Sequence, residues 1–370
     1  MNDEAVNPEL SDHEDQLGSE RIRRSNVDRT RKKDVRHRER HSVKEIAIDT
    51  DAGSYIKARV ISTEGANFIT RDESGAEYRA RSVKSTKSGN ENATLVAVGD
   101  DVLIEPSDGD ISVIREVLFR RTKLSRKAHK RNDNFEQVIA ANIDILAVVM
   151  SAGDPPFQNG ILDKYIVAGH EGGLDILIVL NKADELDENP RRHFINEALE
   201  YYEKIGYMSI RTSAISGGGL TELKKIFENK LAVFAGKSGV GKSSLVNSLL
   251  GKQVAHTKEL SRKEQRGMHT TTTTSLLAIG EGTNGFIVDT PGIREFFHFD
   301  LDPDLIKFHF ADFLTLQEDC AMTNCMHIHE PGCAVIEAVE DGEIPEWRYN
   351  SYMGLWEEAE RERKIKANGI

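Results

Sequence analysis

The 370-residue sequence contains no apolar stretch long enough to span a bilayer, so it predicts no membrane-spanning helix. It also lacks an excess of basic residues, because the net charge is −12, which gives no global sign of a nucleic-acid partner. The first sixteen residues are acidic and lack the apolar core of a secretory signal. From these absences we expect a cytoplasmic, monomeric protein without a membrane partner.

Cysteine is scarce. The three cysteines cannot form a disulfide scaffold, and all of them lie between positions 320 and 333. Together with His327 they have the spacing C-x4-C-x-H-x5-C, and three thiolates with one imidazole complete a tetrahedral Zn²⁺ shell with no open position. His329 is a competing ligand. The predicted structural Zn²⁺ site consists of Cys320, Cys325 and Cys333 with one histidine, His327 or His329.

The most specific motif follows five apolar or small residues at 231–235, which are typical of a buried parallel strand. Its pattern G-x-x-x-x-G-K-S predicts a phosphate-binding loop, in which backbone N–H groups and the start of a helix face phosphate oxygens. Lys242 is suited to the β- and γ-phosphates and Ser243 to Mg²⁺. The predicted loop consists of Gly236, Lys237, Ser238, Gly239, Val240, Gly241, Lys242, Ser243 and Ser244.

The tetrad Asn181-Lys182-Ala183-Asp184 predicts that the nucleotide is GTP. A carboxylate such as Asp184 can accept hydrogen bonds from guanine N1–H and its exocyclic amine, whereas adenine has no such amine. Asn181 can bond the other edge of the base and Lys182 can pack over the rings. Ser213-Ala214 can offer backbone N–H to the guanine oxygen. An ATP-dependent kinase, the competing interpretation, leaves Asp184 without a role.

The order of these elements is rotated relative to ordinary GTPases. The tetrad precedes the phosphate loop, and the segment D-T-P-G, with Asp289 suited to Mg²⁺ and Gly292 to the γ-phosphate, comes last. A circular permutation explains this order, because a sheet cut at an exposed loop keeps its contacts. Alternating strands and helices predict a doubly wound parallel sheet. The segment after Gly292 is predicted to transmit the nucleotide state to the C-terminal region.

The catalytic water needs a group other than glutamine, because Ile293 stands where many GTPases carry a glutamine after D-T-P-G. His269 is the best candidate by its chemistry, and the alternative is a loop residue that only lies near phosphate. One threonine of the run 270–274 is expected to bind Mg²⁺. We assign Thr271, although five consecutive threonines leave the register open.

The remaining sequence predicts the domain boundaries. Residues 1–43 form a disordered tail, first acidic and then basic, and short β segments over 44–116 predict an OB-fold barrel. Residues 117–136 form a basic linker, whose seven cations within 120–131 are also candidates for contact with nucleic-acid phosphate. Residues 137–299 form the GTPase domain, and 300–370 a helical zinc-binding domain with helices at about 302–313 and 346–366. RNA-contact candidates in the barrel, which are otherwise ordinary solvent-side charges, are Lys57, Arg59, Arg79 and Arg81.

Taken together, the permuted order, the GKSGVGKSS loop, the H-T-T-T element, D-T-P-G-I-R-E-F, the preceding barrel and the cysteine cluster resemble the RsgA (YjeQ) family. The resemblance implies hydrolysis of GTP during late maturation of the small (30S) ribosomal subunit. It implies turnover stimulated by that subunit, contact with its 16S rRNA, and release of the protein upon hydrolysis. It also favours His327 over His329 as the zinc ligand and His269 as the catalytic residue. A GTP-gated RNA-binding module with incidental hydrolysis is the alternative.

Overall fold

The structure is a computed structural model that describes residues 55–88, 93–107, 109–127, 136–251, 274–280, 284–289 and 301–367. The predicted tail and the predicted site residues His269, Thr271 and Gly292 lie outside these ranges. Within them, no helix combines the length and apolar character needed to cross a membrane.

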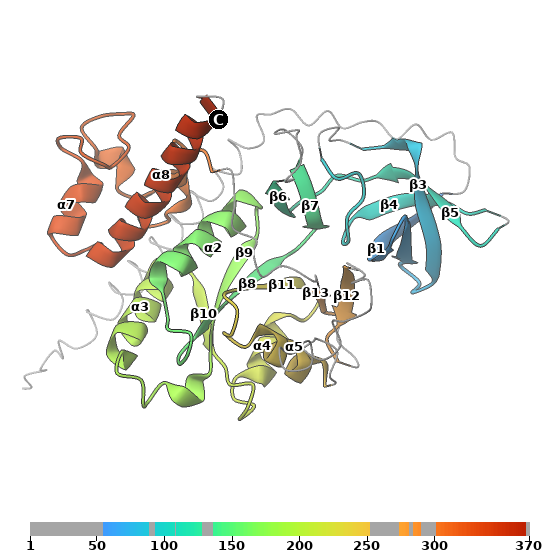
Figure 1. Cartoon of the computed structure of the whole chain (residues 1–370), viewed down its shortest axis with the longest axis horizontal. Coiled ribbons are helices and arrows are strands. Elements are labelled where there is room, and N and C mark those ends of the chain that lie inside the picture. Colours follow the sequence, from blue (N-terminus) through green and yellow to red (C-terminus); the bar gives the residue numbers. More distant parts are fainter. Residues whose placement is uncertain are drawn as a thin grey trace, which may run out of the picture. The chain divides into compact units, whose positions relative to one another are not determined.

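Five strands near the start of the described chain form a barrel (Figure 1). They pair in the order β1-β2-β3-β5-β4, and pairing of β4 with β1, with Ile104 opposite Ile56, closes the ring. Alternate side chains such as Ala58 and Val60 point into its core, which confirms the predicted OB-like barrel. The strands are β1 (Ile56–Glu64), β2 (Asn67–Asp72), β3 (Glu77–Lys87), β4 (Asp101–Glu105) and β5 (Ser112–Val117).

A second group of strands continues the same sheet in the order β10-β9-β8-β11-β13-β12. Neighbours are parallel except β12, which runs antiparallel to β13. Every residue of β8 and β11 is buried, as in a sheet covered on both faces. The strands are β8 (Ile145–Ser151), β9 (Asp175–Asn181), β10 (Met208–Arg211), β11 (Leu231–Ala235), β12 (Ser275–Ala278) and β13 (Phe286–Asp289).

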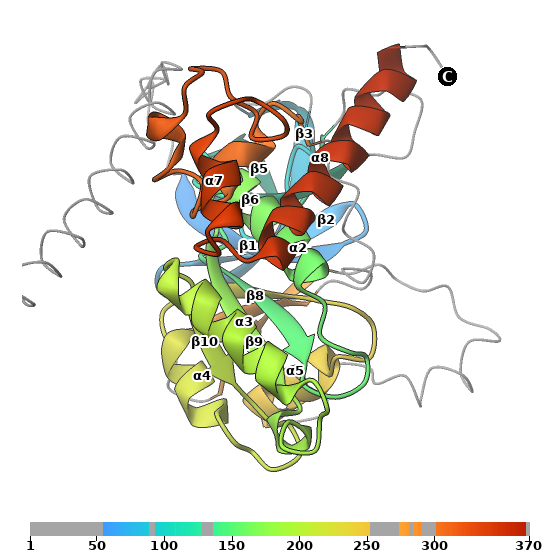
Figure 2. The same ribbon diagram turned by 90° about the vertical axis from the view of Figure 1, so that its left-hand side faces the viewer.

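Helices cover both faces of this second group, which confirms the doubly wound fold (Figure 2). On one face α2 (Asn159–Glu171) and α3 (Arg192–Lys204) bury apolar side chains such as Leu162. On the other face α4 (Leu220–Ile226) and α5 (Lys242–Leu250) do so. Between the barrel and this domain, β6 (Lys123–Lys127) and β7 (Glu136–Ala141) form an antiparallel pair. Strand β6 lies within the segment predicted as a linker.

The C-terminal region contains η4 (Ile306–His309), η5 (Gln317–Asp319), α7 (Ala334–Glu340) and α8 (Glu346–Ala367). Helix α8 confirms the prediction for 346–366, but the helix predicted for 302–313 is wrong, since only the 3₁₀ turn η4 lies there. The turn stops at Phe310, whose backbone is extended (φ −96°, ψ 101°), so the helical conformation is not continued to 313.

Arg348 of α8 lies in a buried charge cluster that joins the C-terminal region to the GTPase domain. Its side chain is 1 % exposed and donates to Asp312 through Nε (3.0 Å) and one terminal nitrogen (2.8 Å), and to Asp163 of α2. Asp163 also accepts the Tyr202 hydroxyl at 2.6 Å, and the guanidinium lies 4.2 Å from the Phe310 ring centroid. Despite burial, which would lower it, the carboxylates hold the pKa of Arg348 well above its ordinary value.

Replacing Arg348 by alanine should lower the free energy of unfolding by about 3–5 kcal/mol, because two carboxylates then lie buried without their cation. Urea unfolding followed by tryptophan fluorescence measures the loss. The matched control is Arg363→Ala in the same helix. Arg363 is half-exposed and pairs with Asp304 and Glu360, so its removal should leave the unfolding midpoint nearly unchanged. Equal shifts for both variants would contradict the structural role of Arg348.

Candidate nucleotide site and metal cluster

The loop between β11 and α5 comes so close to neighbouring strands at two of its glycines that no side chain fits there. Gly236 and Gly241 have φ angles of 143° and 96°, a region that side-chain-bearing residues rarely adopt. A Cβ atom on Gly236 would lie 2.3 Å from the Val149 carbonyl oxygen, and one on Gly241 would lie 2.2 Å from Asn181 Nδ2. The loop therefore approaches the ends of β8 and β9 as closely as a backbone can.

Gly241→Ala should weaken binding of a fluorescent GTP analogue at least tenfold, because the added methyl group both strains the backbone and displaces Asn181. The control is Gly251→Ala at the other end of α5. Gly251 also has a positive φ, of 66°, but no atom lies within 4 Å of its missing Cβ. That variant should lose stability only, by about 1 kcal/mol. Unchanged affinity in Gly241→Ala would contradict the close approach.

Lys242 and its neighbours stabilise the loop from inside. Lys242 Nζ donates to the carbonyl oxygens of Gly236 (2.5 Å) and Lys237 (2.7 Å). Val240 is buried in the core beneath α5, whereas Lys237, Ser238 and Gly239 are exposed. Ser243 is half-buried in the first turn of α5, and Ser244 beside it is exposed. An exposed loop that precedes a helix N-terminus has the geometry that binds phosphate.

The tetrad at the end of β9 is bonded directly to this loop. Buried Asn181 donates through Nδ2 to the Val240 carbonyl at 2.9 Å and accepts the Thr212 hydroxyl at 3.3 Å. Lys182 has a left-handed backbone with φ of 57°, and its ammonium group donates to the Asp154 carbonyl. The 3₁₀ turn η2 (Ala183–Glu185) follows and leaves the Asp184 carboxylate exposed.

Residues after β10 reach the same place. The Ala183 N–H donates to the Thr212 carbonyl at 3.0 Å, which joins the tetrad to the segment that contains Ser213 and Ala214. The Ser213 hydroxyl accepts the Ser216 N–H at 3.0 Å and closes a tight turn. The structure thus brings together the tetrad, the Ser-Ala element and the loop, although about fifty residues separate the tetrad from the loop in the chain.

Asp289 ends β13, the strand next to β11 on the side away from β9. Because Val288 is paired with Val233 in parallel register, Asp289 lies at the same carboxyl edge of the sheet as the glycine loop. Three parallel strands that end in the tetrad, the loop and this acid form one ligand-binding edge.

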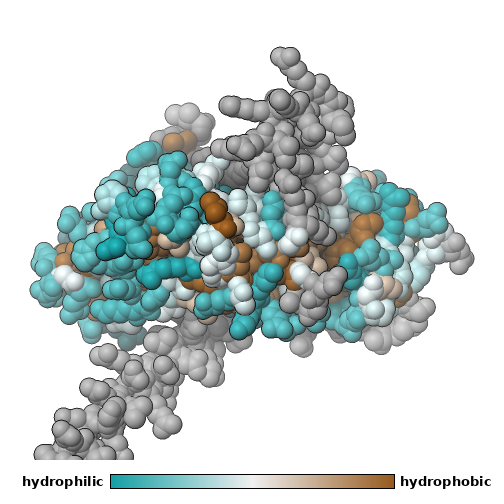
Figure 3. All heavy atoms as spheres, turned by 90° about the horizontal axis from the view of Figure 1, so that it is seen from below, coloured by the Kyte–Doolittle hydropathy of each residue, from teal (hydrophilic) through white to brown (hydrophobic). Residues whose placement is uncertain are grey.

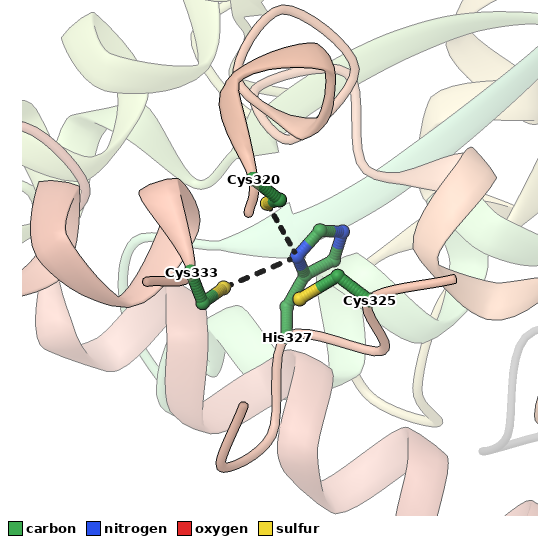
Figure 4. Close-up of side chains that lie close together, drawn as sticks. All are labelled: Cys320, Cys325, His327 and Cys333. Carbon is green, nitrogen blue, oxygen red and sulfur yellow. Dashed lines mark hydrogen bonds between the residues drawn. The ribbon is translucent and has the colours of Figure 1, made fainter. Parts of the chain in front are cut away.

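Four side chains converge in the C-terminal region, on loops around α7 (Figure 4). The three sulfur atoms and one His327 nitrogen all lie within 4.8 Å of one another. His327 Nδ1 is 3.6 Å from Cys320 Sγ and 3.3 Å from Cys333 Sγ. Tetrahedral Zn²⁺ with bonds of about 2.0–2.3 Å separates its ligand atoms by similar distances, so the donors fit the metal. His329 is exposed and is not part of the cluster.

Burial favours the neutral form of the donors. It raises the pKa of the Cys325 thiol to about 12 and lowers the pKa of His327 to about 4. A neutral imidazole can offer its lone pair to a metal directly, whereas the thiols need a cation to ionise. Glu330 orders the loop between the ligands by accepting the N–H groups of Met326 (2.8 Å) and Ile328 (2.8 Å).

Comparison with known proteins identifies the family. The sequence profile of the RsgA GTPase family matches residues 117–299. The chain is 40% identical to the small ribosomal subunit biogenesis GTPase RsgA of Chlorobaculum parvum over 303 residues, which are 80% of this chain and 96% of that protein. The chain belongs to the RsgA GTPase family. It is therefore a GTP-hydrolysing enzyme that uses GTP with Mg²⁺.

Other relatives of the RsgA family agree in sequence and fold. The RsgA of Chlorobaculum tepidum is also 40% identical, with 80% of this chain and 96% of that protein covered. The crystal structure of YjeQ from Thermotoga maritima matches with a TM-score of 0.66 and 31% identity, covering 82% of this chain and 98% of that one. The circularly permuted GTPase YloQ matches in fold with a TM-score of 0.65 and 24% identity, over 85% and 98% of the two chains. The predicted permutation is confirmed.

The structure adds two contacts to the glycine loop that no sequence motif indicates. The backbone N–H of Gly236 bonds to the hydroxyl of buried Tyr165 on α2, while burial raises the pKa of that hydroxyl. Lys237 Nζ donates to Gln158 Oε1 at 2.7 Å, just before the same helix. The sequence pattern over 160–169 indicates a helix, but it does not identify what the helix touches.

Many of the cations proposed for RNA contact are paired with acids. In the barrel, Lys57 lies 3.6 Å from Glu73, Arg59 2.9 Å from Asp101, and Arg79 3.6 Å from Glu64, while Arg81 is exposed. Ion pairs at the surface contribute little to stability, so these pairs do not show that the cations serve the fold alone. On the face shown in Figure 3, hydrophilic residues gather mainly at the left-hand end, and hydrophobic residues lie among paler ones across the middle.

In the segment predicted as a basic linker, one cation is bonded to a buried acid and to backbone carbonyls. Arg120 pairs with Asp100, which has no exposed side-chain surface, and also donates to the Thr94 and Leu95 carbonyls. Its neighbours Arg121 and Lys123 face Asp144 and Glu136. Arg120 therefore holds the barrel wall together, and it is a poor candidate for phosphate contact.

Proposed function

We propose that this chain acts on the small (30S) ribosomal subunit and hydrolyses GTP to GDP and phosphate during late maturation of that subunit. The printed names of its relatives, small ribosomal subunit biogenesis GTPase, support this partner. The barrel and the zinc-binding region contact 16S rRNA in this proposal, and the subunit stimulates turnover of a monomeric, cytoplasmic enzyme.

The observation that carries the nucleotide site is the 2.9 Å hydrogen bond from Asn181 to the Val240 carbonyl. It places the tetrad against the glycine loop, so that one nucleotide can span both. Guanine then faces Asp184 and the Ser213-Ala214 backbone, and the phosphates face the loop and Lys242. Mg²⁺ is held by Ser243 and Thr271, with Asp289 acting through water and the Gly292 amide facing the γ-phosphate.

His269 is the proposed catalytic residue. Hydrolysis needs the attacking water to be oriented toward the γ-phosphorus, and Ile293 has no polar atom for that task. An imidazole can accept a hydrogen bond from the water and hold it in line. Stimulation by the subunit then consists of bringing His269 into position.

Turnover of GTP with and without 30S subunits tests the proposal in the parent, Lys242→Ala and His269→Ala. The parent should be slow alone and accelerated by the subunit. Lys242→Ala should lose activity in both conditions because charge on the phosphates is no longer neutralised. His269→Ala should bind GTP normally and lose most of the stimulated rate, by about 10²-fold or more. A parent that binds subunits without acceleration would favour the GTP-gated RNA-binding module.

A further inference from the structure

Strand β1 of the barrel has two successive partners along one edge. Residues Ile56 to Arg59 pair with β4, whose Asp101 lies opposite Arg59. Strand β4 begins there, so the rest of that edge of β1 is open to another strand. Beyond a register shift between Val60 and Ser62, β12 takes this position, with Ser62 opposite Ser275. The barrel and the GTPase domain thus share one continuous sheet.

Three contacts fix this junction. The Thr63 N–H donates to the Thr274 carbonyl at 3.1 Å, and the Thr274 N–H donates to the Thr63 hydroxyl at 3.2 Å. Leu276, one residue further along β12 than Ser275, packs against both the barrel core and the core of the GTPase domain. The Thr63 side chain therefore supplies a hydrogen bond between the two strands that their backbone groups do not make at this position.

The location of Thr274 gives the junction its significance. It ends the threonine run that the sequence singles out for Mg²⁺, and β12 continues into β13, whose last residue is Asp289. Thr271 is three residues away, which an extended chain spans in about 10 Å. The barrel therefore holds one end of the segment that must be placed correctly around GTP and its metal ion.

We propose that Thr63 is a positioning residue through which nucleic acid bound to the barrel controls GTP hydrolysis. A ligand that shifts β1 relative to the GTPase sheet changes the position of Thr274, and with it the threonine run. The coupling is reciprocal, since a nucleotide state that favours one arrangement of β12 also changes the affinity of the barrel for its ligand. This inference rests on the proposed function, which supplies the barrel's ligand.

The test compares Thr63→Val with Thr63→Ser and Thr70→Val in the full-length protein. Valine keeps the shape of threonine and removes the acceptor for the Thr274 N–H, whereas serine restores it. Thr70 is the matched control in the neighbouring strand, because its hydroxyl donates to the Tyr78 carbonyl at 3.3 Å within the barrel. We measure kcat and KM for GTP with and without 30S subunits, and the affinity of each variant for subunits with GDP and with a non-hydrolysable GTP analogue.

Thr63→Val should keep its KM for GTP and its unstimulated rate, and its stimulated kcat should fall about five- to tenfold, the cost of one lost hydrogen bond at this half-buried junction. Its preference for subunits in one nucleotide state should shrink by the same factor. Thr63→Ser should restore both values and Thr70→Val should leave both unchanged. Full stimulation in Thr63→Val, or equal losses in Thr63→Val and Thr70→Val, would overturn the inference.

A second measurement separates this inference from the proposed function. Amide hydrogen exchange over 274–279 in the free protein should differ between GDP and the GTP analogue, and the difference should vanish in Thr63→Val. If the parent is not stimulated by subunits, the proposed function fails, while this difference still supports the junction as a nucleotide-sensitive element. If exchange does not respond to the nucleotide, the coupling role of Thr63 is refuted even when stimulation is present.

Discussion

Asp184→Asn should convert this GTPase into an enzyme selective for xanthosine triphosphate. The Asp184 carboxylate is an acceptor only and matches the two donors on the guanine edge. An asparagine side chain presents an acceptor and a donor, which matches xanthine, where an oxygen replaces the exocyclic amine. Affinity for GTP should fall about 10²- to 10⁴-fold, since two hydrogen bonds to a charged group at about 1.5–3 kcal/mol each are lost or mismatched.

Competition of unlabelled GTP or XTP against fluorescent GTP measures this change of nucleotide preference. Turnover with XTP checks that the variant still hydrolyses a nucleoside triphosphate. The matched control is Asp187→Asn, three residues further on, where the carboxylate is 90% exposed and pairs with Arg192 at 3.1 Å. That variant should keep its preference for GTP. A loss of GTP binding in Asp184→Asn without any gain for XTP would mean that Asp184 supports the fold and does not read the base.

Loss of the metal should have the second large effect, on the structure of the C-terminal region. Zinc contributes about 10–16 kcal/mol of apparent binding free energy to small zinc domains at pH 7. Here an apolar core that includes Phe310, Phe313 and Tyr352 also stabilises the C-terminal region. Chelation should therefore loosen the loops around 320–333 and leave most of α8 folded. Cys333→Ser should reduce bound zinc from one per chain to less than about a tenth of that.

Metal content of the purified protein, with limited proteolysis before and after chelation, tests this prediction. His329→Ala is the control, because His329 is exposed two residues from His327 and should leave the zinc content intact. Metal loss in His329→Ala together with retention in His327→Ala would reverse the ligand assignment. Protein isolated with no zinc and with intact loops would show that the four side chains pack without a metal.

Strongly patterned segments were predictable where short-range chemistry dictates the backbone. The glycine spacing of the loop, the short β segments of the barrel and the apolar run of β11 all appear in the structure as predicted. The segment 302–313 was not, because the backbone leaves the helical conformation at Phe310, whose ring packs on Phe313 in the core with centroids 5.0 Å apart. In α8 the spacing of Tyr349, Met353 and Trp356 predicted a core stripe, but these three are only half-buried and the buried stripe is Tyr352, Leu355 and Ala359.

The sequence by itself determined the chemistry of this protein: the guanine tetrad, the phosphate loop and the zinc ligands are recognisable because few other residue types can do their work. Only the tertiary structure decided which parts act on one another. Arg348 with Asp163, Tyr165 with Gly236, and Thr63 with Thr274 are pairs distant in sequence. No local pattern marks them, because a hydrogen bond between distant residues depends on how strands and helices pack and not on the residues beside it in the chain.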